Sequence, residues 1–97
     1  MDSLDGIIDR AKRHLAQTGH VPQEKVALKQ VEAVSWPDTS IGSPRAGRAY
    51  AQVVTPGYRL VLSDGFSDFE YHTDGKGRVV LHRVIDRAGR ITEGGVP

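Results

Sequence analysis

The sequence predicts an α+β domain in which one N-terminal helix packs on an antiparallel sheet of about four strands. Apolar residues recur at helical spacing near the N-terminus, and apolar and polar residues alternate between residues 58 and 85. A long Pro/Gly-rich loop follows the first strand, at about residues 37–49. With 97 residues the chain can bury one modest core, so residues 1–97 are expected to form a single domain.

The first element is a helix at about residues 3–17. Its apolar stripe consists of Leu4, Ile7, Ile8, Ala11 and Leu15. Asp2 or Ser3 can cap the first turn, and Gly19 followed by Pro22 supplies a stop. The stripe must therefore face the sheet.

The first strand and the long loop come next. Residues 25–36 are rich in β-prone side chains, but their alternation changes phase near Gln30, which predicts a β-bulge. Two prolines and two glycines then interrupt regular structure: Pro37, Gly42, Pro44 and Gly47. Residues 51–54 can pair briefly before Pro56 and Gly57 turn the chain.

The remaining strands form a meander over about residues 51–85, and residues 93–97 form a frayed tail. A two-residue turn at Asp64 and Gly65 would place these pairs opposite each other: Tyr58 with Tyr71, Arg59 with Glu70, and Leu60 with Phe69. A second turn at residues 74–77 would add Tyr71 with Val80 and Phe69 with His82. The predicted core face is Tyr58, Leu60, Leu62, Phe69, Tyr71 and Val80, with Val61, Val79 and Leu81 on the opposite face.

Composition excludes several classes of function. Lys and Arg number 13 against 12 Asp and Glu, and a net charge of +1 gives no general attraction to nucleic acid or membrane. Cysteine is absent, which removes disulfides, thiolate catalysis and Cys-rich zinc sites. No apolar run is long enough for a secretory signal or a membrane span, so we expect a cytoplasmic protein.

Two motifs suggest chemistry, and each has a simpler structural interpretation. Trp36, Pro37 and Asp38 resemble the acid loop of tyrosine phosphatases, but with no cysteine nucleophile they are expected to seal the core and open a turn. Glu70, His72 and Asp74 alternate on one strand and could form a small hydrolase or metal site. No glycine-rich nucleotide loop is present, so no cofactor is expected.

About half of the chain resembles a small uncharacterised bacterial family. The run WPDTSIGSPRAGRAYAQVVTPGYRLVLSDGFSDFEYHTDGKGRVVLHR is similar to that family's pattern WPDSSLGCPxPGxxYxQxxTPGYRIxLxxxGxxYEYHTDxxGRVVxC. Ser43 and His82 stand where the pattern has cysteines. If these cysteines form a disulfide in relatives, the resemblance implies that packing or hydrogen bonding ties the loop to the last hairpin strand here.

A second resemblance is to PepSY-like and cystatin-like layouts, through the order of helix, strand and meander. Residues 52–57, QVVTPG, are similar to the cystatin Q-x-V-x-G loop but have Pro at position 56 and the Gly one residue late. This resemblance implies a peptidase-inhibitor-like role as an alternative.

The sequence therefore predicts a small, non-enzymatic binding module with no nucleic-acid, membrane or metal partner. Aromatic and arginine anchors on a held loop are typical of protein or peptide contacts. The candidates are Trp36, Arg45, Tyr50 and Tyr58. The partner is unknown, and a second copy could also pair with an open sheet edge.

Overall fold

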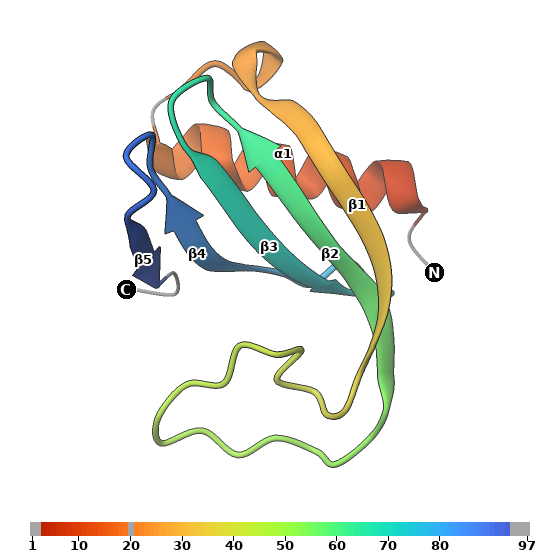
Figure 1. The fold of residues 1–97 in the computed structure, drawn as a ribbon. Coiled ribbons are helices and arrows are strands. Elements are labelled where there is room, and N and C mark those ends of the chain that lie inside the picture. Colours follow the sequence, from red (N-terminus) through yellow and green to blue (C-terminus); the bar gives the residue numbers. More distant parts are fainter. Residues whose placement is uncertain (1–2, 20, 94–97) are drawn as a thin grey trace.

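The computed structural model describes residues 3–19 and 21–93. One helix, α1 (Leu4–Gly19), and a short 3-10 helix, η1 (Gln23–Lys25), precede the sheet. Its strands are β1 (Ala27–Trp36), β2 (Thr55–Ser63), β3 (Asp68–Asp74), β4 (Val79–Ile85) and β5 (Ile91–Glu93). The strands are antiparallel and lie side by side in chain order, with α1 across one face (Figure 1). The α+β prediction is confirmed, with five strands in place of about four.

The apolar stripe of α1 forms half of the core, as its spacing predicts. Ser3 caps the helix by accepting a hydrogen bond from the Gly6 N–H at 3.1 Å. The buried cluster between helix and sheet contains Ile7, Ala11, Leu15, Val26, Leu60, Leu62 and Tyr71. The face of the sheet that carries these side chains is called the helix face below.

The irregularity predicted near Gln30 is present in β1. Its pairing with β2 shifts register between Leu28 and Gln30, which is a β-bulge. Lys29, beside the bulge, reaches Asp68 of β3 with its ammonium group at 3.0 Å. β1 is an edge strand, and most of its side chains are exposed.

The predicted pairing of β2 with β3 is wrong by two residues. Leu60 lies opposite Tyr71, and Ser63 opposite Asp68, so the connection is the four-residue loop 64–67 and not a two-residue turn. The side chain of Asp64 closes this loop by accepting hydrogen bonds from the Phe66 and Ser67 N–H groups. Because a shift of two preserves side-chain direction, the residues predicted for the core on these two strands still share the helix face.

The predicted pairing of β3 with β4 is also wrong. A second bulge shifts the register: β4 carries one extra residue, His82, opposite the step from Glu70 to Tyr71 of β3. The observed pairs are Tyr71 with Leu81, Phe69 with Val84 and His72 with Val80. Val79 and Leu81 consequently pack on the helix-face core, and Val80, which was assigned to that core, lies on the other side.

Other parts of the chain also differ from expectation. Residues 51–54 belong to no strand, because β1 ends at Trp36, opposite Thr55. The fifth strand follows a turn in which the Asp86 N–H donates to the carbonyl of Arg90. The predicted tail extends beyond residue 93, outside the described residues. No helix in the described chain is long and apolar enough to cross a membrane.

Candidate functional site

A buried polar cluster occupies the face of the sheet opposite α1. On β3, the hydroxyl of Tyr71 lies 2.7 Å from His14 of α1, so the alternating neighbours Glu70 and His72 point to the other side. Glu70 is 5% exposed and His72 4%. We call this side the loop face, because residues 37–54, the loop between β1 and β2, supply contacts to it.

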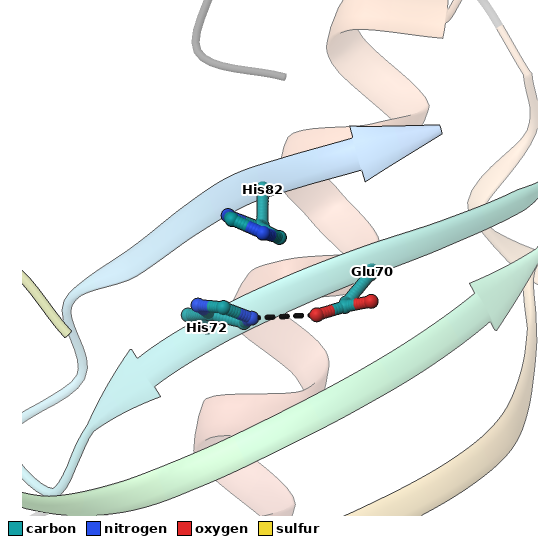
Figure 2. A group of neighbouring side chains, drawn as sticks. All are labelled: Glu70, His72 and His82. Atoms are coloured by element: carbon teal, nitrogen blue, oxygen red, sulfur yellow. Dashed lines mark hydrogen bonds and ion pairs between the residues drawn. The ribbon is translucent and has the colours of Figure 1, made fainter. Parts of the chain in front are cut away.

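Three aromatic rings are stacked on the loop face. The His72 ring lies between Trp36 of β1 and His82 of β4, with centroid distances of 4.4 Å and 4.1 Å. The interplanar angle between the two imidazoles is 16°. Figure 2 shows His82 above His72, with Glu70 beside it on the same strand. The stack therefore joins three strands across the sheet.

Both ring nitrogens of His72 face acceptors. Its Nδ1 lies 2.8 Å from the carbonyl oxygen of Ile41, and its Nε2 lies 2.7 Å from Oε2 of Glu70. The two faces of the same ring are covered by an indole and by a second imidazole. The His72 ring is therefore fixed by polar contacts at both nitrogens and by aromatic stacking on both faces.

Glu70 provides the negative charge of the cluster. The Arg83 guanidinium donates to its Oε1 at 2.8 Å, and that of Arg59 lies 3.3 Å from its Oε2. Burial alone raises the pKa of Glu70, but hydrogen bonds from His72 and Arg83 and the charges of Arg59 and Arg83 outweigh burial and lower that pKa to about 2. The carboxylate is thus ionised at neutral pH.

The loop is fitted closely to this cluster. Ile41 is fully buried with a positive φ of 49°, a conformation that strains a β-branched residue. At the adjacent Gly42 a Cβ would lie 2.7 Å from the Trp36 ring, so only glycine fits there. Ser43 then meets His82 at 3.2 Å between Oγ and Nδ1. From the sequence, packing or a hydrogen bond is expected between positions 43 and 82, and a hydrogen bond joins them here.

The proposed set Glu70, His72 and Asp74 does not assemble as predicted. Asp74 closes the turn between β3 and β4, where its Oδ1 accepts hydrogen bonds from the Lys76 and Arg78 N–H groups. His82, and not Asp74, lies beside Glu70 and His72, because the bulge in β4 turns both His82 and Arg83 toward the loop face. Two consecutive polar residues within an apolar strand were the sequence signal for this bulge. Glu70 and His72 are buried, so this part of the loop face is not exposed to solvent.

The ligand atoms of Glu70, His72 and His82 lie within 4.8 Å of one another, a spacing that could hold a metal ion. Imidazole lone pairs lie in the ring plane, so two nearly parallel stacked rings do not direct them to a common point. Both nitrogens of His72 already have partners, and two arginines contact the carboxylate. The arrangement consequently favours a charged clamp between loop and sheet over a metal centre.

The four sequence-predicted contact residues do not form one surface. Trp36 is 8% exposed, and its indole N–H donates to the carbonyl of Thr73 at 2.9 Å, so in this conformation it offers no surface to a partner. Tyr58 packs on the edge of the helix-face core. Arg45 and Tyr50 meet within the loop, where the Arg45 N–H donates to the tyrosine hydroxyl at 3.0 Å.

An open groove lies beside the end of the loop. It has a volume of about 530 Å³ and is lined by Thr39, Val53, Val54, Thr55, Pro56, Asp74, Gly75 and Lys76. Val53 is 58% exposed and Val54 67%, which are high values for valine side chains that adjoin each other. Tyr58 lines a second hollow of about 330 Å³ that shares Pro56 and Gly75 with the groove. Residues 53 and 54 were not among the predicted contacts.

Comparison with known proteins gives one match. Curated proteins and solved structures yield none. A family model described as "Domain of unknown function (DUF8738)" matches residues 8–82, a span that includes most of α1, the whole loop and all three residues of Figure 2. Because this match covers well over half of the chain, the protein belongs to the DUF8738 family of domains of unknown function.

Proposed function

We propose that this domain is a non-enzymatic binding module that receives an extended peptide segment of a partner protein in the groove beside Val53 and Val54. The observation that carries the proposal is the exposure of these two valines at the wall of the groove. Burying a valine side chain contributes about 1.5–3 kcal/mol, so covering both would supply a useful part of a binding free energy.

The backbone beside the groove favours an extended partner. Residues 51–54 directly precede β2 and pair with neither β1 nor β3. Ala51 is held by Thr39, whose N–H donates to its carbonyl and whose hydroxyl accepts from its N–H. Within the described chain, the one hydrogen bond to the backbone of residues 52–54 is from the Thr55 hydroxyl to the carbonyl of Val53. The other peptide groups are available to an added strand.

Charge at the rim favours an acidic peptide. Lys76 is exposed and has no ion pair within the described residues. Asp74 is the acidic residue of the lining, and its Oδ1 is occupied by two backbone N–H groups of its own turn. Arg78 adds a further positive charge, since its guanidinium donates to the carbonyl of Thr39 in the groove wall. An extended peptide with alternating apolar and acidic side chains matches this surface.

The residues predicted from the sequence keep a place in this proposal. Tyr58 lies in the hollow that continues the groove, and Arg45 and Tyr50 belong to the same loop. Trp36 lies below the surface, where its side chain contacts Thr73 and His72 of β3 and its ring lies against Gly42 of the loop.

The test is selection of a displayed library of random eight-residue peptides against the native domain, followed by fluorescence anisotropy of the enriched peptide. We expect enrichment of β-branched or aromatic residues alternating with Asp or Glu. Val54→Asp should weaken binding at least about tenfold, and Lys76→Glu should weaken acidic peptides more than neutral ones.

Val31→Asp is the matched control. Val31 is 42% exposed on β1, away from the groove, so its substitution should leave affinity unchanged. An enriched peptide that binds Val54→Asp as tightly as the native domain would exclude the groove as the contact surface. Failure to enrich any peptide would contradict the binding-module proposal in this form.

A further inference from the structure

We propose that two copies of this chain associate through β1, in a two-fold dimer whose antiparallel sheet continues across the axis. Three features of β1 support the dimer: an unpaired edge, an uncovered apolar stripe and the placement of its charges. No residue of β1 lines the groove beside Val53 and Val54, so the dimer does not depend on the peptide-binding function proposed above.

The free edge of β1 is long and open. The strand has ten residues and pairs with β2 on one side, and no other strand of the described chain lies beyond it (Figure 1). The N–H and C=O groups that point to that side therefore have no strand to pair with. The bulge at Lys29 leaves residues 30–36 in unbroken register with β2. The opposite edge strand, β5, has only three residues.

One side of β1 is an apolar stripe that the helix does not cover. The stripe consists of Leu28, Val31 and Ala33, whose partners on β2 belong to the helix-face core or pack on it. Directly opposite residues share a face, so the stripe lies on the helix face. None of its three residues belongs to that core, and Leu28 is 37% and Val31 42% exposed. A second copy that adds its own stripe beside this one would remove both from water.

The charges of β1 favour one position for the two-fold axis. An axis at Gln30 would bring the two Lys29 side chains together, and an axis at Glu32 would place two carboxylates opposite each other. An axis at Val31 avoids both contacts. It places Gln30 opposite Glu32 of the second copy and Lys29 beside that pair, all on the loop face. Opposite charges then approach each other twice, once on each side of the axis.

Lys29 and Glu32 are accessible for these contacts. Both side chains are more than half exposed, and their ion pairs with Asp68 and Arg59 lie at the surface. Exposed ion pairs are weak, so either side chain can turn toward the second copy at little cost.

The same axis joins the two apolar stripes. Val31 meets Val31 of the second copy and, with the bulged Lys29 passed over, Leu28 meets Ala33. An axis perpendicular to the sheet keeps both helix faces on the same side of the joined sheet. Apolar residues therefore meet apolar residues on one face, and polar residues meet polar residues on the other.

Sedimentation equilibrium of the native chain tests association. One strand from each copy is a small interface, below about 1,200 Å² in total, so we expect a dimer that dissociates on dilution from about 500 to about 1 µM. Val31→Asp places two carboxylates at the axis and should raise the dissociation constant at least about a hundredfold. A native chain that is monomeric at about 500 µM would overturn the proposal, as would equal dissociation constants for the two proteins.

Disulfide cross-linking tests the position of the axis. The chain has no cysteine, so Val31→Cys introduces a single thiol. Directly opposite Cα atoms lie about 4.5–5.5 Å apart, within the range of a disulfide bond. Phe66→Cys is the matched control, because Phe66 is 69% exposed, more than Val31, and lies between β2 and β3. Oxidation should link Val31→Cys at least about tenfold faster than the control. Equal rates would contradict an axis at Val31.

Charge reversal separates contacts across the axis from effects within one copy. Lys29→Glu leaves two acidic side chains near the axis and Glu32→Lys leaves two basic ones, so each variant alone should dimerise at least about tenfold more weakly than native. An equimolar mixture of the two should recover association, because opposite charges then face each other. Effects of each change on its own fold are the same alone and in the mixture. A mixture that associates no better than its components would refute the proposed pairing.

Peptide binding distinguishes this proposal from the groove function. The monomeric Val31→Asp variant should bind the enriched peptide as tightly as the native chain, since Val31 is outside the groove. A dimer that binds no peptide would reject the groove alone, and peptide binding by a native chain that is always monomeric would reject the dimer alone.

Discussion

At the scale of single residues, Glu70 holds the charges of the loop face together. Its carboxylate contacts one histidine and two arginines that come from three different strands. A buried carboxylate with such partners stabilises the fold only while it is ionised, because protonation weakens its attraction to all three partners at once.

The first prediction concerns the stability of the native fold in acid. The pKa of Glu70 is about 2 in the folded chain and 4.5 in a free side chain, so its contribution is fully present above about pH 4.5 and is lost as pH falls toward 2. The loss should be roughly 3 kcal/mol at most. Urea unfolding between pH 6 and 2.5 measures it.

Two substitutions control this measurement. Glu70→Gln should be less stable than native at pH 6 and should lose less stability below pH 4.5. Asp68→Asn, on the same strand but at a partly exposed ion pair with Lys29, should keep the native profile. An unchanged acid profile in Glu70→Gln would show that other carboxylates cause the loss.

The second prediction concerns Thr73, which is fully buried with a hydroxyl that has no hydrogen-bond partner within the described residues. Thr73→Val replaces this hydroxyl with a methyl group of similar size and should raise the free energy of unfolding by about 1 kcal/mol. Thr55→Val is the control, because the Thr55 hydroxyl donates to Val53, and it should give no gain. A less stable Thr73→Val would indicate that the hydroxyl is satisfied in solution.

At the scale of elements, the most constrained position in the sheet is Gly57 of β2. A Cβ there would overlap the carbonyl oxygen of Thr73 on the neighbouring strand. The third prediction is that Gly57→Ala forces β2 and β3 apart and costs at least about 3 kcal/mol in urea unfolding.

Gly75→Ala is the matched control for this substitution. A Cβ at Gly75 would make only an ordinary contact, 3.6 Å from the carbonyl oxygen of Pro56, so the change should cost less than about 0.5 kcal/mol. Similar stability of the two alanine variants would mean that the strands separate at this point without penalty.

The elements also show what the sequence could predict. Helical spacing and the phase change near Gln30 gave α1 and the bulged β1, because local patterns determine both. Strand register was not predictable from alternation alone, since the loop at residues 64–67 moves the pairing without changing the local pattern. The bulge near Tyr71 is marked only by the two adjacent polar residues of β4, His82 and Arg83. The assignment of Val80 to the core was wrong for this reason.

The candidate site was less predictable than the fold. Glu70 and His72 could be paired by alternation along one strand. His82 joins them through a bulge, and Ile41 through a loop with an unusual backbone angle, so neither was predictable from spacing. The stack depends on tertiary contacts between segments about thirty to forty residues apart in sequence.

At the scale of the whole molecule, the two faces of the sheet bury clusters of different chemical character. The helix face has an apolar core closed by α1, and the loop face has a charged, hydrogen-bonded cluster closed by the loop. The first can account for the stability of the fold, and the second holds the loop in a specific position. A domain built in this way can change its loop without dismantling its core.

The chain order of the strands has a consequence for how the domain folds. β2, β3 and β4 are joined by short turns, whereas β1 reaches β2 only by closing residues 37–54, which costs more conformational entropy. We expect the three central strands to form the folding nucleus with α1, and β1 to join afterwards.

Truncating Leu60 to Ala should then slow refolding, whereas truncating Trp36 should mainly accelerate unfolding, as stopped-flow kinetics can measure. Equal effects of both changes on the refolding rate would place the long loop in the rate-limiting step.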